Sequence, residues 1–186
     1  MKRAELELAI AAATRIVAQD RVLIIGSQAI LGSFDEHQLP GRAIESREVD
    51  IASLDDDQAE SLATRLDALA GEWSEFDQKH GFYIQGVSVR AAYLPDGWMD
   101  RLVEVVPPTR PESTGLCLDP HDLCAAKLAR NDEKDREFVG ALVSAGLVDP
   151  GLIAERVELI TDRRFLSSQR RIVRELVRSY RRKPRP

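Results

Sequence analysis

Two acidic residues at alternate positions are the side chains of this chain best suited to metal-dependent chemistry. Glu48 and Asp50 lie within a short apolar run, SREVDIAS, that reads as a β-strand. Because strand side chains alternate between faces, the two acids project one way, while Val49 and Ile51 project into the core. Mg²⁺ takes oxygen ligands and is commonly bound by one or two carboxylates together with substrate phosphates. The pair therefore predicts a metal site, and the structural alternative is a solvated acidic sheet face.

A glycine–serine pair earlier in the chain could bind phosphate. Gly26 and Ser27 end the apolar run 22–25, which predicts a buried strand, and Ser27 is expected to cap a helix over 28–31. Where a strand meets a helix, glycine lets a phosphate approach the backbone, and free N–H groups can bind it. A turn that merely caps a helix is the alternative. Together with the acids, the pair makes phosphoryl or nucleotidyl transfer the leading hypothesis.

Periodicity and turn residues give the elements that must position these side chains. Helices are predicted near residues 5–18, 28–31, 55–70, 120–130, 132–145, 150–161 and 164–182. Strands are predicted near residues 22–25, 47–53, 82–94, 102–106 and 116–118. The pattern indicates an α/β (α+β) fold with a small mixed sheet followed by a helical bundle. We expect residues 1–118 to form the core and residues 119–186 a helical region that completes the active site, the two together forming one compact unit.

Charge is unevenly distributed along the chain. From Arg163 to the C-terminus there are nine arginines and one lysine against a single acid, whereas the preceding residues carry 16 basic and 30 acidic residues. A basic segment on an acidic chain indicates an anionic partner. The alternative is an amphipathic helix whose polar face is salt-bridged to the acidic body, and the sequence favours neither. The candidate RNA-binding residues are Arg170, Arg171, Arg174 and Arg178.

Hydropathy bounds the location of the protein. No apolar run approaches the roughly 20 residues that a membrane span needs. Glu5, Glu7 and Arg15 interrupt the apolar N-terminal stretch, which therefore reads as an amphipathic helix and not as a signal peptide. We expect a cytoplasmic protein without membrane contact, and a monomer is favoured.

Two stretches resemble known families. An apolar strand, Gly-Ser, a helix, a loop and an acid-x-Asp strand over residues 22–53 resemble the polymerase-β-like nucleotidyltransferase superfamily. Residues 118–148 look like the C-terminal motif of the nucleotidyltransferase-type toxins of the AbiEii and MenT group. Lys127 matches a lysine in one helix of that motif, and Lys134-Asp135-Arg136 matches a Lys-Asp-Arg-like run in the next. Residues 94–102 also look like members of this group.

The resemblance implies a polymerase-β-like fold and a reaction. A nucleoside triphosphate (NTP) would bind at Gly26 and Ser27, with its Mg²⁺ held by Glu48 and Asp50. A polynucleotide 3′-hydroxyl would attack the α-phosphate and pyrophosphate would leave. In this toxin group the acceptor is tRNA, whose extended 3′ end can no longer be aminoacylated. The implied partners are tRNA, NTP and a cognate antitoxin.

The resemblance also implies roles for three residues of the helical region. Lys127 would pair with the triphosphate as a point charge. Arg130, about one turn further on, could assist it or be solvated. Asp135 would orient Lys127, aid the metal or activate the hydroxyl, and the sequence does not choose among these roles.

Two features depart from the superfamily pattern. Glu48 stands where the first carboxylate is more often Asp, and the strand expected to carry a third carboxylate, residues 87–93, contains no acid. Asp96 and Asp100 come only after this strand, in or after a turn. Either Asp135 takes the place of the third carboxylate, or the reaction does not need one. The gap leaves two alternatives open: a non-catalytic nucleotide- or RNA-binding module on this fold, and nucleotidyl transfer to a protein or small molecule.

Overall fold

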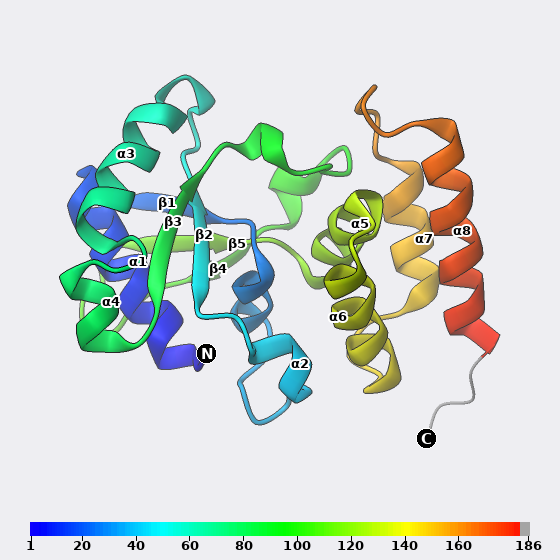
Figure 1. Ribbon diagram of the computed structural model, residues 1–186, viewed down its shortest axis with the longest axis horizontal. Helices are drawn as coiled ribbons and strands as arrows, with labels where there is room; N and C mark the ends of the chain where they lie inside the picture. Colours follow the sequence, from blue (N-terminus) through cyan, green and yellow to red (C-terminus); the bar gives the residue numbers. More distant parts are fainter. Residues whose placement is uncertain (183–186) are drawn as a thin grey trace.

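Five strands form one mixed sheet in the computed structural model, which describes residues 1–182 (Figure 1). The strand order is β3-β2-β1-β5-β4. The strands are β1 (Arg21–Ile24), β2 (Glu48–Ala52), β3 (Tyr83–Val87), β4 (Val103–Val105) and β5 (Thr114–Cys117). The pairs β1–β5 and β2–β3 are parallel, whereas β1–β2 and β4–β5 are antiparallel. The expected mixed α/β class with a small mixed sheet is confirmed.

Two helices, α1 (Arg3–Val17) and α3 (Ala59–Ala70), cover one face of the sheet. Glycine allows α3 to approach closely, because a Cβ at Gly86 would lie 2.2 Å from Cα of Ala63. Val49 and Ile51 are fully buried, as the alternation predicted. Every second residue of β2 therefore packs into the core, and the intervening acids are directed to the opposite face.

The helical region follows β5 and comprises α5 (Pro120–Arg130), α6 (Glu133–Ser144), α7 (Pro150–Glu158) and α8 (Ser167–Arg182). Asp119 caps α5 by accepting hydrogen bonds from the N–H groups of His121 and Asp122, and Pro120 lies in the first turn, as predicted. Figure 1 shows α5 and α6 next to the sheet and α7 and α8 on their far side. In the described part of the chain, no helix has the length and apolarity that crossing a membrane requires.

Several local predictions were wrong. Gly26, not Ser27, occupies the cap position of the next helix, and this helix is the 3₁₀ helix η1 (Ser27–Gly32), with no side-chain cap. The β-structure expected over 82–94 ends at Val87 and gives way to the 3₁₀ helix η3 (Val89–Ala91). The Ser88 hydroxyl accepts a hydrogen bond from the Arg90 N–H and so caps η3.

Besides η1 and η3, four short helices lie in the connections between the main elements of the described chain. They are α2 (Gly41–Ile44), η2 (Asp56–Gln58), α4 (Glu75–His80) and η4 (Trp98–Arg101). The sequence pattern does not mark α2 or α4 as separate helices, because helices of four to six residues are too short to show a 3.6-residue periodicity.

Candidate active site

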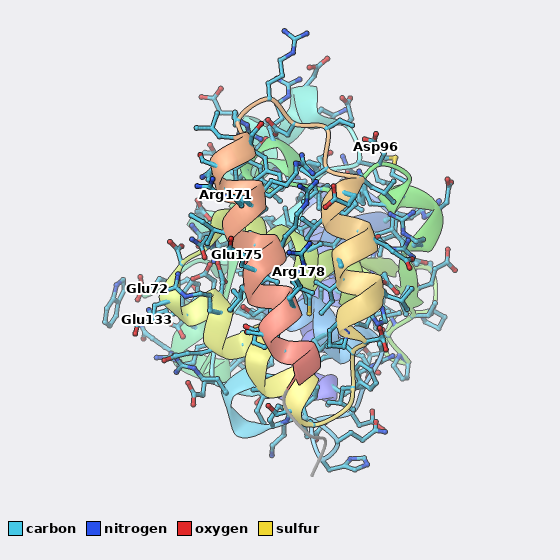
Figure 2. All side chains as sticks on the ribbon, turned by 90° about the vertical axis from the view of Figure 1, so that its right-hand side faces the viewer. Glu72, Asp96, Glu133, Arg171, Glu175 and Arg178 are labelled. Atoms are coloured by element: carbon cyan, nitrogen blue, oxygen red, sulfur yellow. The ribbon has the colours of Figure 1, made fainter. Side chains whose placement is uncertain are left out.

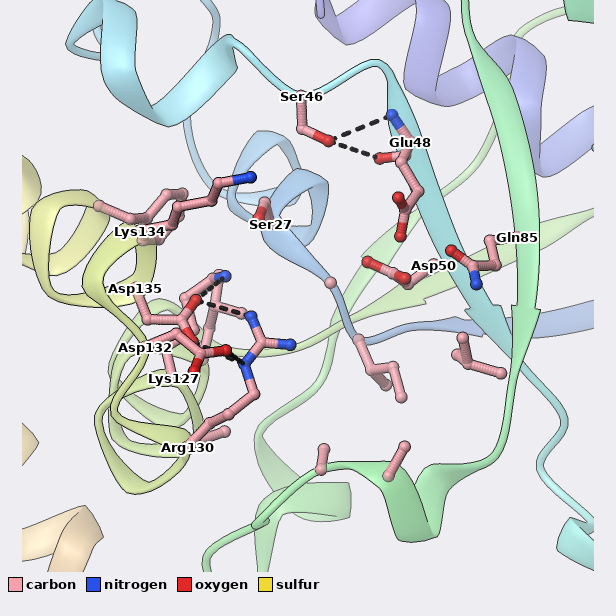
Figure 3. Close-up of a pocket in the computed structure, with 18 of the residues that line it drawn as sticks. Ser27, Ser46, Glu48, Asp50, Gln85, Lys127, Arg130, Asp132, Lys134 and Asp135 are labelled. Carbon is pink, nitrogen blue, oxygen red and sulfur yellow. Dashed lines mark hydrogen bonds and ion pairs between the residues drawn. The ribbon is translucent and has the colours of Figure 1, made fainter. Parts of the chain in front are cut away.

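Three chain segments meet at one edge of the sheet and surround a cavity of about 760 Å³ (Figure 3). Gly26 and Ser27 follow β1, Glu48 and Asp50 begin β2, and the chain leaving β5 enters α5. Because β2 runs antiparallel to β1, its first residues lie beside the end of β1, and the Ile25 N–H donates to the Asp50 carbonyl oxygen at 3.2 Å. The topology thus brings together residues that the sequence separates widely.

The two carboxylates of β2 line the cavity together. Burial, a hydrogen bond with Glu48 and the charge of Glu48 together raise the pKa of Asp50 to about 7. Tyr83 Oη donates to Glu48 Oε2 at 3.0 Å. Ionising both of these close carboxylates costs free energy, because the two negative charges repel each other. Either a proton on one of them or a cation bound between them would remove this repulsion.

The strand beside these acids contributes neutral side chains. In the parallel β2–β3 register, Tyr83 lies opposite Glu48 and Gln85 lies opposite Asp50. Gln85 lines the cavity, so a neutral amide and not a third acid lies beside Asp50 on the neighbouring strand. Among the described residues, no group of three or more His, Cys, Asp or Glu side chains could hold a metal ion. Sequence reasoning missed Tyr83 and Gln85 because it sought the third acid on residues 87–93.

Gly26 makes room for one of the acids. A Cβ at this position would lie 1.6 Å from Oδ2 of Asp50, whereas the φ of Gly26, −88°, is open to any residue. Ser27 lines the cavity as the first residue of η1. Because η1 is a six-residue 3₁₀ helix, no α-helix N-terminus follows Gly26, and the phosphate site expected here stays a prediction that rests on the Gly26–Ser27 turn.

The opposite wall of the cavity carries basic residues of α5 and α6 (Figure 3). Lys127 Nζ lies 2.9 Å from Asp135 Oδ1, and Arg130 donates to both oxygens of Asp135, from Nε at 2.6 Å and from Nη2 at 2.9 Å. Lys127 Nζ also lies 4.7 Å from the centroid of the Phe138 ring. Lys134 points into the cavity near Ser27.

Asp135 is the shared anion of this basic wall. Burial alone would raise its pKa, but the hydrogen bonds from Arg130 and the charge of Lys127 outweigh burial and lower the pKa. The carboxylate is therefore ionised at neutral pH and fixes both cations. Of the three roles that the sequence left open for Asp135, the contacts support the orientation of Lys127.

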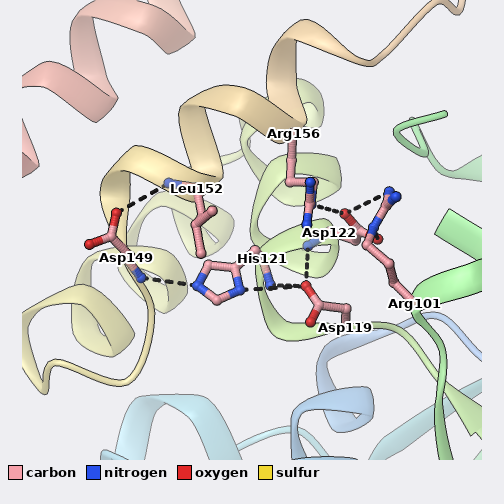
Figure 4. Close-up of polar contacts among 7 residues, drawn as sticks. All are labelled: Arg101, Asp119, His121, Asp122, Asp149, Leu152 and Arg156. Carbon is pink, nitrogen blue, oxygen red and sulfur yellow. Dashed lines mark hydrogen bonds and ion pairs between the residues drawn. The ribbon is translucent and has the colours of Figure 1, made fainter. Parts of the chain in front are cut away.

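A buried polar network holds α5 beside the sheet (Figure 4). Asp122, which is fully buried, pairs with Arg101 Nε at 2.8 Å and with Arg156 Nε of α7 at 3.1 Å. His121 Nε2 accepts from the backbone N–H of Asp149 at 3.1 Å. These contacts join the first turn of α5 to η4 and α7, which fixes the helix that carries Lys127.

The four arginines predicted to bind RNA differ in their surroundings. Arg170 donates to the carbonyl oxygens of Val157 and Ile160, each at 2.6 Å, and Arg174 pairs with Glu158. Arg171 and Arg178 are exposed on the outer surface of α8 (Figure 2). Because α5 and α6 separate α8 from the sheet, none of the four lines the cavity.

A protein-family model described as "Nucleotidyltransferase of unknown function (DUF6036)" matches residues 4–184. The chain belongs to this nucleotidyltransferase family. A search of curated proteins and a search of solved structures each gave no match. An NTP is therefore the implied substrate, and nucleotidyltransferases typically use a divalent metal as well.

The cavity of this nucleotidyltransferase has donors that fit a divalent cation. Glu48 and Asp50 supply carboxylate oxygens on one face, and burial of Asp50 beside Glu48 makes the pair costly without a neutralising charge. Mg²⁺ suits this donor set, because it is usually bound by one or two carboxylates and completes its shell with phosphate oxygens and water.

Proposed function

We propose that this protein is a Mg²⁺-dependent nucleotidyltransferase toxin that transfers nucleotides from an NTP to the 3′ end of tRNA. The observation that carries the proposal is the opposition of two walls in one cavity. Glu48 and Asp50 form the acidic wall, and Lys127 and Arg130 form the basic wall. An NTP with its metal carries both charge signs, and this cavity offers a complementary charge to each.

Different residues of the cavity bind the phosphates, position the cations and hold the metal. The Ser27 hydroxyl and the adjoining backbone bind phosphate oxygens, while Lys127 and Arg130 bind the triphosphate. Asp135 holds these two cations in place. Glu48 and Asp50 hold the metal, which when bound would neutralise charge on the phosphates and orient them.

In the proposed transfer, one bond to the α-phosphorus forms and one bond to it breaks. The oxygen of the acceptor 3′-hydroxyl bonds to the α-phosphorus, and the bond from that phosphorus to the bridging oxygen of the β-phosphate breaks. The hydroxyl proton passes to solvent water and pyrophosphate leaves. The two walls act chiefly by positioning the reactants and stabilising the charge on the phosphates.

The toxin role rests on the resemblance of residues 118–148 to the AbiEii and MenT group. An extended tRNA 3′ end cannot be aminoacylated, so translation stops, and a cognate antitoxin would keep the enzyme in check. Arg171 and Arg178 of α8 are exposed and are proposed to contact the body of the tRNA.

Gln85 supports a second candidate function. Because Gln85 is a neutral amide, the strand beside Asp50 supplies no third carboxylate that could accept the hydroxyl proton. A non-catalytic module that binds nucleotide or RNA would tolerate this change. Transfer to a protein or small molecule is a further alternative, which the same assay would reveal.

The test is incorporation of label into tRNA. Purified protein is incubated with total tRNA, Mg²⁺ and each α-labelled NTP in turn, and the RNA is resolved on a sequencing gel. The parent protein is compared with Asp50→Asn and with Asp57→Asn, an exposed carboxylate outside the cavity. We expect label from the parent and from Asp57→Asn but none from Asp50→Asn.

Three other results would each change the proposal. Equal labelling by parent and Asp50→Asn would show that the assigned site is wrong. Nucleotide binding without transfer to any acceptor would favour the non-catalytic module. Label entering a protein or small molecule, but no RNA, would keep the transferase and replace its acceptor.

A further inference from the structure

Tyr93 connects the cavity to a basic and aromatic segment outside it. Its side chain lines the cavity and also contacts the α7–α8 connection. The centroid of its ring lies 5.2 Å from Cζ of Arg164 and 5.9 Å from the centroid of the Phe165 ring. We define Tyr93, Arg163, Arg164 and Phe165 as the arginine corner.

Hydrogen bonds fix this corner beside the cavity. The segment that carries Tyr93 is tied to the end of α7, because the Asp96 N–H donates to the Leu159 carbonyl oxygen and Thr161 Oγ1 donates to Asp96 Oδ1, both at 2.9 Å. Phe165 is buried, and Cζ of Arg170 lies 4.6 Å from the centroid of its ring. Figure 1 shows the α7–α8 connection close to the segment that follows β3.

The charges of the corner face solvent. Arg163 and Arg164 are both exposed. Arg164 shares its charge with Asp162, whereas no hydrogen bond or ion pair within residues 1–182 involves the Arg163 side chain. Arg170 and Arg174 of α8 differ, because Arg170 already donates to the carbonyl oxygens of Val157 and Ile160 and Arg174 already pairs with Glu158. The corner therefore presents cationic groups at the cavity edge, where α8 presents none.

We propose that a single-stranded polynucleotide reaches the cavity across the arginine corner, with phosphates beside Arg163 and Arg164 and a base stacked on Tyr93. An NTP fits within the cavity, but a polymer whose end lies there must continue over the surface. Arginines next to an aromatic ring are the usual recognition set for unpaired nucleotides, because each base offers a ring face and each linkage a charge. This inference rests on the proposed function and specifies its acceptor as an unpaired polynucleotide end.

The test measures RNA binding separately from catalysis. Fluorescence anisotropy of a short labelled single-stranded RNA is recorded with the full chain in Mg²⁺ over a series of salt concentrations, and binding of a fluorescent NTP is measured in parallel. Arg163→Glu with Arg164→Glu reverses the corner. Arg15→Glu with Lys79→Glu reverses two exposed charges elsewhere and is the charge-matched control.

We expect the corner reversal to weaken RNA binding at least about 10-fold and to reduce the slope of log affinity against log salt by about 1.4, or about 0.7 for each lost phosphate contact. NTP binding and the charge-matched control should remain as in the parent. Tyr93→Leu should lose about 5-fold or more in RNA affinity, whereas Tyr93→Phe, which keeps the ring, should not.

Other outcomes separate this inference from the function on which it rests. Unchanged RNA binding in the corner variant, or an equal loss on reversing Arg171 and Arg178, would overturn the corner as the acceptor path. NTP binding without binding of any RNA would also overturn it, but would leave transfer to another acceptor possible. RNA binding that depends on the corner, in a protein that binds no NTP, would uphold the corner and overturn the proposed function.

Discussion

Gly26 and Asp50 share the space at the end of β1: a Cβ on Gly26 would lie only 1.6 Å from Oδ2 of Asp50. Glycine is thus required at position 26 because the Asp50 side chain of the neighbouring strand β2 occupies the space of a Cβ. Its φ is ordinary and imposes no such requirement. The position that sequence reasoning assigned to phosphate contact is at the same time the position that lets the half-buried carboxylate of Asp50 face the cavity.

Gly26→Ala should therefore abolish nucleotidyl transfer by displacing Asp50. The added methyl group cannot share space with the carboxylate, so Asp50 must rotate or β2 must shift. We expect a loss of at least about 100-fold in transfer, because a displacement of about 1 Å at a reacting centre has effects of this size. Gly41→Ala is the control, since a Cβ at Gly41 meets nothing within 4 Å. Full activity in Gly26→Ala would contradict the assignment of Asp50.

Asp50→Asn should stabilise the metal-free protein at alkaline pH. The folded-state pKa of Asp50 is raised to about 7, so the parent has its full stability below about pH 4 and loses some as the pH rises through 7. Asparagine carries no charge to desolvate beside Glu48. We expect a gain on the order of 2 kcal/mol at pH 8 in EDTA, shrinking toward pH 4, by urea denaturation. A gain that did not change with pH would show that charge is not the cause.

Asp135→Asn should destabilise the protein, because it leaves Lys127 buried without an anion. The Lys127 and Asp135 side chains are 10% and 2% exposed, and breaking a buried ion pair from one side costs about 3 kcal/mol. Asp132→Asn is the matched control: Asp132 pairs with Arg130 at the surface, and its loss should cost no more than about 0.5 kcal/mol. Urea denaturation of the two variants decides the matter, and equal costs would refute the proposed role of Asp135.

Trp73→Gly should stabilise the protein although it removes a large side chain. Trp73 has a φ of +67° and is 80% exposed, so its side chain packs little while its backbone is strained. Glycine adopts this conformation freely, and we expect a gain of about 0.5–1 kcal/mol. Trp73→Ala keeps the strain and should show no gain. Thermal denaturation that ranked alanine above glycine would contradict this explanation.

The sequence alone determined the elements that rest on local rules. Asp119 and Pro120 specify the start of α5 because a carboxylate cap and a fixed φ act within one turn. Alternation along β2 specified that Val49 and Ile51 are buried while Glu48 and Asp50 share the other face. The nucleotidyltransferase assignment also came from local motifs, and the match over residues 4–184 supports it.

Tertiary structure decided what depends on partners distant in the chain. The register of β3 places Gln85 beside Asp50, and no pattern within residues 82–94 encodes this, because strand pairing is set by burial across the whole sheet. The basic helix α8 looked like a nucleic-acid surface in sequence, but packing on α7 committed Arg170 and Arg174 to internal contacts. The sequence shows how many charged residues a segment contains, whereas only the fold decides which of them already have partners and which face the site.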